Sequence, residues 1–479
     1  MTDIPTPLAP SRSSTAAQIR SSRPNSILAF CLVLLTAAAP IPLGANGPVA
    51  WCLNAGLVSV IGFAYALTLL LNKQALRVGI SSLGAETILA VLLGGFILFQ
   101  TVPATMWGGT AALTDVDGNS YPVAQLSAAA GVTVLSALNY AAYVVFFFLV
   151  LQISANRNRA LVMAELAFAA IIAHAVFGLI ALTLWNDSLL FFEKWAYHGV
   201  AVGTFVNRNT YGTFLAIGFV LGVGLTLRAA LSRRNERGQR LPRADEKFVW
   251  VGLQVVGTIL IFAALLASQS RMGLGAAIAG ATVVVLIASL KTKLAQRQNG
   301  LLGLLAFAAI AGVALFVYGG GTLDRLGSTE VDADVRQLLY IQVLQMIENH
   351  WLWGTGAGTF ELVYPLYHRW PVSPDLIWDK AHNSYLTMWS ELGIIFGSVP
   401  LLIFAALGTR LIILITQRRD DWWLPTLSLA SIIVVGVHSL VDFSMEIQGV
   451  VFMLLFVVGL GLDFRTKSTT SQAQGEISK

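Results

Sequence analysis

The chain has 479 residues, of which 56% are hydrophobic and only 11% are charged. Soluble domains carry roughly 25% charged residues, so this composition excludes an ordinary soluble protein. Apolar runs of about 18 residues or more, the length that crosses a bilayer as a helix, recur between Ser26 and Phe464. The runs are continuous, whereas a membrane β-barrel would show ~10-residue alternating segments. The sequence therefore predicts an all-α integral membrane protein.

In chain order, the apolar runs predict about twelve transmembrane helices. A disordered cytoplasmic tail rich in Ser, Pro and Arg is expected over 1–25. The helices are expected at 26–44, 49–71, 83–104, 129–153, 160–184, 208–231, 248–267, 272–290, 300–319, 384–416, 423–441 and 448–464. Helices one to nine thus occupy 26–319, one long loop spans 320–383, the last three helices occupy 384–464, and a second cytoplasmic tail covers 465–479.

The lysines and arginines predict the orientation, because cytoplasmic connections carry an excess of both. With the N-terminus inside, 23 of the 30 basic residues fall on the cytoplasmic side. The other seven fall outside, and they are Lys194, Arg208, Arg271, Arg325, Arg336, Arg369 and Lys380. Both termini are expected in the cytoplasm. The same rule explains the net charge of +5, so no nucleic-acid partner is expected.

Two polar clusters are expected at outer ends of transmembrane helices. Asn207, Arg208 and Asn209 open the sixth helix, where they serve either as helix caps or as a binding motif. The turn Ser268 to Arg271 precedes the eighth helix, and Ser270 and Arg271 stand at its start. Backbone N–H groups at a helix start attract anions, and arginine adds a planar fork suited to phosphate. The alternative is a capped turn whose arginine reaches lipid headgroups.

The long outer loop contains a third cluster. Its segment 335–349 alternates polar residues, among them Arg336, with apolar ones at a helical period. This pattern predicts an amphipathic helix lying on the membrane surface. The glycine run Gly354 to Gly358 that follows is either a flexible connector or a site of close backbone approach.

A fourth cluster begins the tenth predicted helix. His382 and Asn383 enter it, and Glu391 follows further along. A histidine is suited to proton transfer near neutrality, although an interfacial histidine is often a structural hydrogen-bonding residue. His438 and Asp442 lie four residues apart, either as a pair that supports the site or as a helix-end pair. No convincing metal motif occurs, so no metal is predicted.

The order and spacing of these motifs resemble the bacterial O-antigen ligase and polymerase superfamily. The resemblance covers about residues 200–450 and rests on the Asn207–Asn209 motif, Ser268–Arg271, Arg336 and the glycine run, and His382 with Glu391. It implies a GT-C-like glycosyltransferase that works at the periplasmic face of the bacterial inner membrane without a metal or cofactor. Members transfer glycans from a polyprenyl diphosphate carrier.

The resemblance also implies roles for residues. The two essential arginines map to Arg271 and Arg336, and the catalytic histidine maps to His382. The family often has Asn-Pro-Asn where this chain has Asn207-Arg208-Asn209. Asn207, Arg208, Asn209, Ser270, Asn383, Glu391 and His438 are then candidates for substrate binding.

Physical chemistry supports an inverting transfer from a polyprenyl-diphosphate-linked glycan. Fixed arginines in a low-dielectric site stabilise the charge that develops on the leaving diphosphate. The acceptor, a glycan or lipid A-core, and hence the choice between polymerase and ligase, stays open. The alternative from another class is a secondary transporter or a flippase of lipid-linked oligosaccharide, which would need charged or broken helices near the bilayer midplane.

Overall fold

The computed structural model describes residues 12–231, 244–292, 326–374, 377–418 and 421–462. The first eight α-helices are α1 (Arg12–Ala38), α2 (Pro48–Leu71), α3 (Gly84–Phe99), α4 (Ala130–Ser154), α5 (Arg157–Thr183), α6 (Arg208–Leu231), α7 (Ala244–Ala267) and α8 (Arg271–Thr292). The later ones are α10 (Leu326–Asn349), α11 (Phe360–Val363), α12 (Ser384–Gly397), α13 (Val399–Gln417), α14 (Trp423–His438) and α15 (Gln448–Gly461). Short 3-10 turns link several of them, at Leu43–Ala45, Ile80–Leu83, Ala104–Trp107, Tyr364–Leu366 and Ser444–Glu446.

The helices confirm a polytopic membrane protein. Within the described residues, eight helices are long and apolar enough to cross a bilayer, and three apolar ones are shorter, at Arg23–Ala38, Trp423–His438 and Gln448–Gly461. These eleven coincide with predicted transmembrane helices. The ninth predicted helix, at 300–319, lies outside the described residues, as do residues 1–11 of the first predicted tail and the whole of the second. Helix α1 begins at Arg12, within the stretch for which the sequence predicts disorder.

The prediction of an all-α chain was wrong in detail, because two short antiparallel hairpins occur. Strand β1 (Ala111–Thr114) pairs with β2 (Ser120–Val123), and β3 (Ser188–Leu189) pairs with β4 (Phe192–Glu193). Both hairpins lie in connections between helices, where Gly118 supplies the left-handed conformation for the first turn. Strands this short carry too weak an alternating pattern to stand out beside long apolar helices.

The single helix predicted at 384–416 was also wrong, because the apolar run divides into α12 and α13. Gly393 has φ 69° and ψ 167°, which is not helical. A side chain there would place its Cβ 2.3 Å from the Leu352 carbonyl oxygen. The close approach of another backbone therefore breaks the helix, and only α13 is long enough to cross a bilayer.

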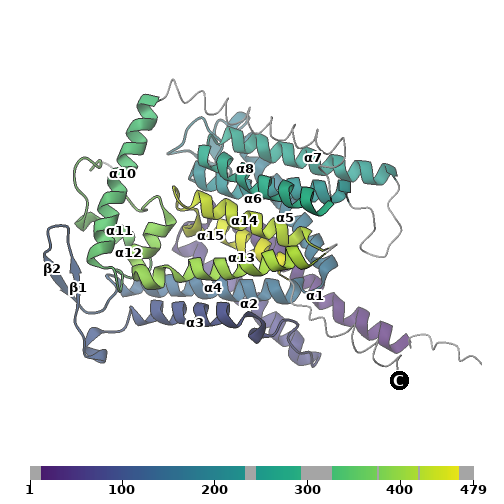
Figure 1. Ribbon diagram of the computed structural model, residues 1–479, viewed down its shortest axis with the longest axis horizontal. Helices are drawn as coiled ribbons and strands as arrows, with labels where there is room; N and C mark the ends of the chain where they lie inside the picture. The colour runs from purple at the N-terminus through teal and green to yellow at the C-terminus, as the bar shows by residue number, and fades with distance from the viewer. Residues whose placement is uncertain (1–11, 232–243, 293–325, 375–376, 419–420, 463–479) are drawn as a thin grey trace, which may run out of the picture.

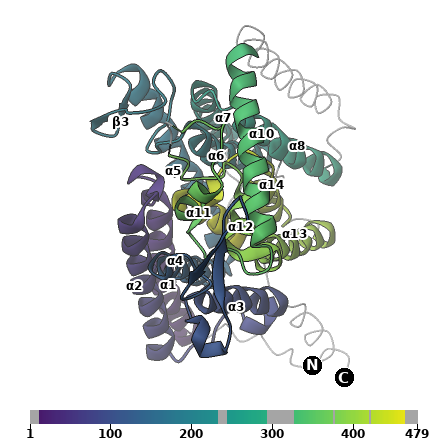
Figure 2. The same cartoon turned by 90° about the vertical axis from the view of Figure 1, so that its left-hand side faces the viewer.

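Helix α10 runs across the end of the bundle, roughly perpendicular to the long helices (Figure 1). Helices α11 and α12 and the β1–β2 hairpin lie at the same end, which we call the loop end (Figures 1 and 2). Leu339, Val343, Met346 and Ile347 form the buried face of α10, whereas Leu344 of the predicted apolar stripe is half exposed.

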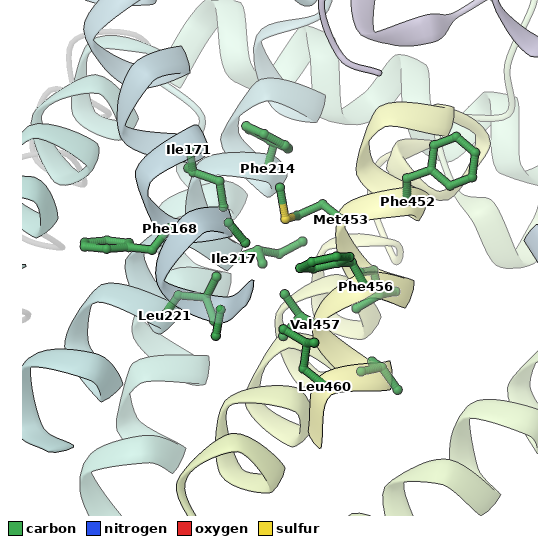
Figure 3. Close-up of a cluster of buried hydrophobic side chains, with 14 of the residues drawn as sticks. Phe168, Ile171, Phe214, Ile217, Leu221, Phe452, Met453, Phe456, Val457 and Leu460 are labelled. Carbon is green, nitrogen blue, oxygen red and sulfur yellow. The ribbon is translucent and has the colours of Figure 1, made fainter. Parts of the chain in front are cut away.

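The core of the bundle lies where α5, α6 and α15 meet. Figure 3 shows Phe214 and Ile217 of α6 facing Met453 and Phe456 of α15, with Ile171 of α5 beside them. All five side chains are fully buried. Each such side chain contributes about 1.5–3 kcal/mol relative to its exposed state in water. In a bilayer the gain comes from close packing instead, because lipid is as apolar as the core. Helix α6 is thus fixed centrally, and its first residues enter the candidate site.

Candidate functional site

The start of α6 and the start of α8 are joined at the loop end. The Asn207 side chain caps α6 by accepting hydrogen bonds from the backbone N–H groups of Asn209 (2.7 Å) and Thr210 (3.3 Å). The Ser270 hydroxyl donates to Asn209 Oδ1 at 3.1 Å and accepts from the Gly273 N–H at 3.2 Å. Two motifs 61 residues apart therefore form one surface, and capping accounts for much of their polarity.

Arg208 and Arg271 open the two helices of this surface. The Arg208 guanidinium lies 5.7 Å from the centre of the Tyr197 ring, and Asn207 Nδ2 donates to the Tyr197 hydroxyl at 3.0 Å. Arg208 Nε is buried and has no hydrogen-bond partner among the described residues. Arg271 is exposed as the first residue of α8. The arginines thus stand at two helix N-termini, where partial positive charge already gathers.

His382 lies just before α12 in a left-handed conformation, with φ 51°. The Tyr340 hydroxyl donates to the His382 carbonyl oxygen at 2.9 Å. Its ring lies between aromatic neighbours, with ring centres 6.0 Å from Trp378 and 5.1 Å from Phe443. His382 Nδ1 is buried without a hydrogen-bond partner in the described part of the chain. Burying an unpaired polar atom is costly, and such atoms often mark a function.

Arg336 supplies the positive charge of this region. It lies one helical turn before Tyr340 on α10, and no hydrogen bond or ion pair joins it to the described residues. Burial, and then the charge of Arg336, lower the pKa of His382 to about 4. His382 is therefore a neutral imidazole at pH 7 and is free to accept a proton.

A buried polar cluster lies below His382, between α6 and α14. His438 Nδ1 and Asp442 Oδ2 are 3.7 Å apart, and both side chains are 0% exposed. The Thr213 hydroxyl lies 2.8 Å from His438 Nδ1, and the Thr210 hydroxyl donates to Asp442 Oδ2 at 3.4 Å. Burial raises the pKa of Asp442 to about 7. The sequence pairing of His438 with Asp442 is thus present in the structure.

The charges of the separate clusters act on one another. Burial, and then the charge of Asp442, raise the pKa of Tyr197, while Arg208 and Arg336 oppose that rise. Arg336 also lowers the pKa of Asp442, against the larger effect of its burial. Residues from the α5–α6 connection, α6, α10 and the α14–α15 connection therefore share one electrostatic site. Tyr197 keeps its proton and remains a hydrogen-bond donor.

Asn383 and Lys380 hold the segment that carries His382. Asn383 Oδ1 caps α12 by accepting from the backbone N–H groups of Tyr385 (3.0 Å) and Leu386 (3.2 Å). Its Nδ2 donates to the Leu440 carbonyl oxygen at 2.8 Å. Lys380 Nζ lies 3.4 Å from Glu446 Oε2. These contacts tie the histidine to the α14–α15 connection from both sides.

The Glu391 carboxylate is occupied by the backbone of the glycine run. Its Oε2 accepts from the Gly358 N–H at 2.8 Å, and its Oε1 accepts from the Phe360 N–H at 3.0 Å. Gly354 approaches α12 so closely that a Cβ there would lie 2.2 Å from the Glu391 carbonyl oxygen. The glycines are therefore needed for close approach, and the flexible-connector interpretation was wrong. Substrate binding by Glu391 stays a prediction.

Sequence reasoning missed several residues that shape the site. Gln100 is fully buried at the end of α3, donates to the Trp353 and Glu391 carbonyl oxygens at 2.8 and 2.9 Å, and accepts from the Ala357 N–H. Tyr340 was detectable by its spacing of four residues from Arg336, which places both on one helix face. Gln100 gave no signal, because a single amide at a helix end is common.

The described residues contain no group of three or more His, Cys, Asp or Glu side chains placed to hold a metal ion. Metal independence itself stays a prediction.

Comparison with known families gives one match. Residues 256–399 match the family model described as O-antigen ligase. The matched stretch includes Arg271, Arg336 and His382, while Arg208 and His438 lie outside it. No curated protein matches the chain. The resemblance predicted from the motifs is confirmed at the level of the domain, over a shorter stretch than the predicted 200–450.

Proposed function

We propose, from the premise that this membrane protein carries an O-antigen ligase family domain, that it is a GT-C-like, twelve-helix inverting glycosyltransferase. It acts on a polyprenyl-diphosphate-linked glycan and serves O-antigen or exopolysaccharide assembly. The observation that carries the proposal is the juxtaposition of a neutral His382, whose ring has no hydrogen bond in the described residues, with the cation Arg336. A leaving diphosphate and an acceptor hydroxyl need these two groups.

The reaction is a direct displacement at the anomeric carbon. The acceptor hydroxyl oxygen forms a bond to that carbon as the bond from the carbon to the diphosphate oxygen breaks. The electron pair leaves with the diphosphate, and the hydroxyl proton passes to a ring nitrogen of His382. Attack opposite the leaving group inverts the anomeric centre.

Arginines stabilise the charge that develops on the diphosphate. Arg336 is the closest candidate, because its charge already acts on His382. Arg271 and Arg208 contribute from the starts of α8 and α6, with backbone N–H groups beside them. Preorganised donors and cations of this kind stabilise a developing anion without reorganising during the reaction.

The remaining candidates support the site. The starts of α6 and α8, which carry Arg208 and Arg271, are held in place by Asn207, Asn209 and Ser270. These three residues also line the surface that binds the lipid-linked donor. Asn383 fixes the start of α12. His438 and Asp442 form the buried floor of the site. Glu391 acts through the glycine run that it holds.

The position of the site sets the compartment. The positive-inside rule assigns the loop end to the periplasmic face of the inner membrane and both termini to the cytoplasm. No nucleotide sugar is expected there, so the donor already carries its activation as a lipid diphosphate.

The deciding experiment is a transfer assay with the full chain in nanodiscs. The donor is a polyprenyl-diphosphate glycan, the acceptors are the same glycan and a lipid A-core, and EDTA is present. Mass analysis that finds longer glycan on the carrier identifies a polymerase, and glycan on the core lipid identifies a ligase. No product, together with transport of a solute or lipid across liposomes, would instead support the transporter or flippase alternative.

A variant series tests the assigned base. His382→Ala removes proton acceptance, so we expect transfer to fall about 10²- to 10⁴-fold while the protein stays folded and inserted. His368→Gln is the matched control, because within the described residues the one polar contact of the His368 ring is from Nε2 to the Val372 carbonyl oxygen at 3.1 Å. Full activity in His382→Ala would remove the base assignment.

A further inference from the structure

The β3–β4 hairpin exposes large apolar side chains at the loop end. Phe191 is 91% exposed, Phe192 63% and Trp195 61%. Leu184 and Trp185, at the end of α5, are also exposed. A hairpin that faces water rarely carries so many apolar side chains close together, and exposed apolar patches usually mark an interaction surface.

Buried contacts at the foot of the hairpin hold its exposed aromatic side chains in place. The Lys194 side chain is buried, pairs with Asp187 and donates to the Val200 carbonyl oxygen at 2.7 Å. Asp187 Oδ2 also accepts from the Gly199 N–H at 2.6 Å. Leu189 of β3 is buried in a small cluster with Val200. The aromatic side chains are therefore presented outward by a fixed framework.

The hairpin lies beside the membrane-spanning surface. Figure 2, which faces the loop end, places β3 at the periphery of the molecule, well apart from α10 and the β1–β2 hairpin. The Trp185 ring packs edge-on against Phe177 of α5 at 5.7 Å. The exposed aromatic surface thus continues from the outer face of α5, a candidate transmembrane helix on which Leu166 is also exposed.

We propose that the segment from Leu184 to Trp195 is an interfacial anchor, whose aromatic side chains insert among the lipids at the boundary between headgroups and acyl chains. Trp and other amphipathic aromatic residues favour this level of a bilayer. The partner is the phospholipid bilayer itself, because the patch is lateral to the bundle and lies at the end of a transmembrane helix.

The anchor also sets the depth of the donor site, an inference that rests on the proposed function. Tyr197 follows Trp195 by two residues, carries Arg208 over its ring and accepts from Asn207. Fixing the hairpin in the interface therefore holds Arg208 at the level of lipid phosphates. A polyprenyl diphosphate would present its diphosphate at that same level.

A depth measurement tests the anchor without any assay of activity. Cys31 and Cys52 are replaced by Ser, and Phe191→Cys in the full chain is labelled with NBD in nanodiscs of phosphatidylethanolamine and phosphatidylglycerol. Lipids with a nitroxide near the glycerol level should quench this probe strongly, and aqueous iodide weakly. Glu361→Cys is the control, because Glu361 is exposed on α11 at the same end and should be quenched by iodide.

Two results would overturn the anchor. Equal iodide quenching at both positions would place the hairpin in water. Protection of position 191 from both quenchers would mean that protein covers it, for example a second copy of the chain.

A kinetic test examines the link to the donor. The double variant Phe191→Ser with Trp195→Ser should raise KM for a full-length polyprenyl donor several-fold with little change in kcat. A short-chain, water-soluble donor should show no change. Equal loss with both donors would refute the depth role. If the wild type transfers nothing but the depth result holds, the proposed function fails and the anchor stands.

Discussion

At the scale of single residues, the proposed site uses two different groups. Arg336 carries positive charge, and His382 accepts the proton. Burial, and then the positive charge of Arg336, lower the pKa of His382 to about 4. The imidazole is thereby neutral at pH 7, although a pKa this low makes it a weak base. Binding an anionic diphosphate at Arg336 would cancel part of the positive field. The pKa of His382 would then rise toward the range that suits a general base.

This coupling predicts a pH dependence. In the proposed mechanism transfer requires neutral His382, so we expect activity to fall as the pH drops through the pKa of His382. For kcat/KM, which reports the free enzyme, the acidic limb should lie near pH 4. For kcat, which reports the donor complex, it should lie at higher pH. Initial rates at low and saturating donor from about two pH units below the His382 pKa of about 4 up to about pH 9 measure both. If the acidic limbs of kcat/KM and kcat fall at the same pH, the diphosphate does not act on the pKa of His382.

At the scale of elements, the break inside α12 at Gly393 positions the proposed base. The Ile394 N–H donates to the Trp351 carbonyl oxygen at 2.7 Å, and the Gly356 N–H donates to the Glu391 carbonyl oxygen at 2.9 Å. The glycine run and the end of α12 therefore pair backbone to backbone. This pairing interrupts α12 at Gly393, where the backbone is not helical, and fixes the short helical segment that follows His382. A continuous helix would take the Ile394 N–H for its own ladder and leave the Trp351 carbonyl oxygen without this partner.

Gly393→Ala tests this junction. A left-handed residue with a Cβ costs about 1–3 kcal/mol in strain, and the Leu352 carbonyl oxygen would lie 2.3 Å from the new atom. We expect a lower unfolding temperature in detergent and reduced transfer. Gly95→Ala in α3 is the control, because in the described part of the chain a Cβ there meets no atom of another element within 4 Å, and its unfolding temperature should not fall. Equal behaviour of both variants would contradict a structural role for the break.

At the scale of the whole molecule, the loop end is fastened to the bundle through α3. Gln100 at one end of α3 holds the glycine run and α12. At the other end, both carboxylate oxygens of Glu86 accept hydrogen bonds from the Arg410 guanidinium of α13. The distance from Arg410 Nη2 to Glu86 Oε2 is 3.0 Å. The Glu86 side chain is 6% exposed and that of Arg410 is 35% exposed, so the carboxylate is shielded from solvent and the guanidinium only in part. Helices α3 and α13 are thus joined at a distance from the site that they support.

The orientation of the whole chain is tested by cysteine accessibility. In a background of Cys31→Ser and Cys52→Ser, Glu361→Cys should react with a membrane-impermeant maleimide from the periplasm. Asn72→Cys, exposed in the connection after α2, should react only after the inner membrane is opened. The opposite pattern would reverse the assigned orientation and move the site to the cytoplasm.

The sequence by itself determined the helices and the family domain. An apolar run of transmembrane length has few alternatives in a bilayer, because every backbone polar group must be paired within the segment. Eleven predicted helices accordingly coincide with apolar helices of the described residues. Arg271, Arg336 and His382 were predicted from their motifs, and all three lie within the matched O-antigen ligase stretch.

Only the tertiary structure decided how those residues are arranged. Several hydrogen bonds of the site join segments that are distant in sequence. They link Asn209 with Ser270, Tyr340 with His382, and Glu391 with Gly358 and Phe360. Local patterns report periodicity and capping but carry no distance between segments. The break at Gly393 has the same cause, because the backbone that interrupts the helix comes from Leu352. Single amides and glycines acquire their roles only through such contacts.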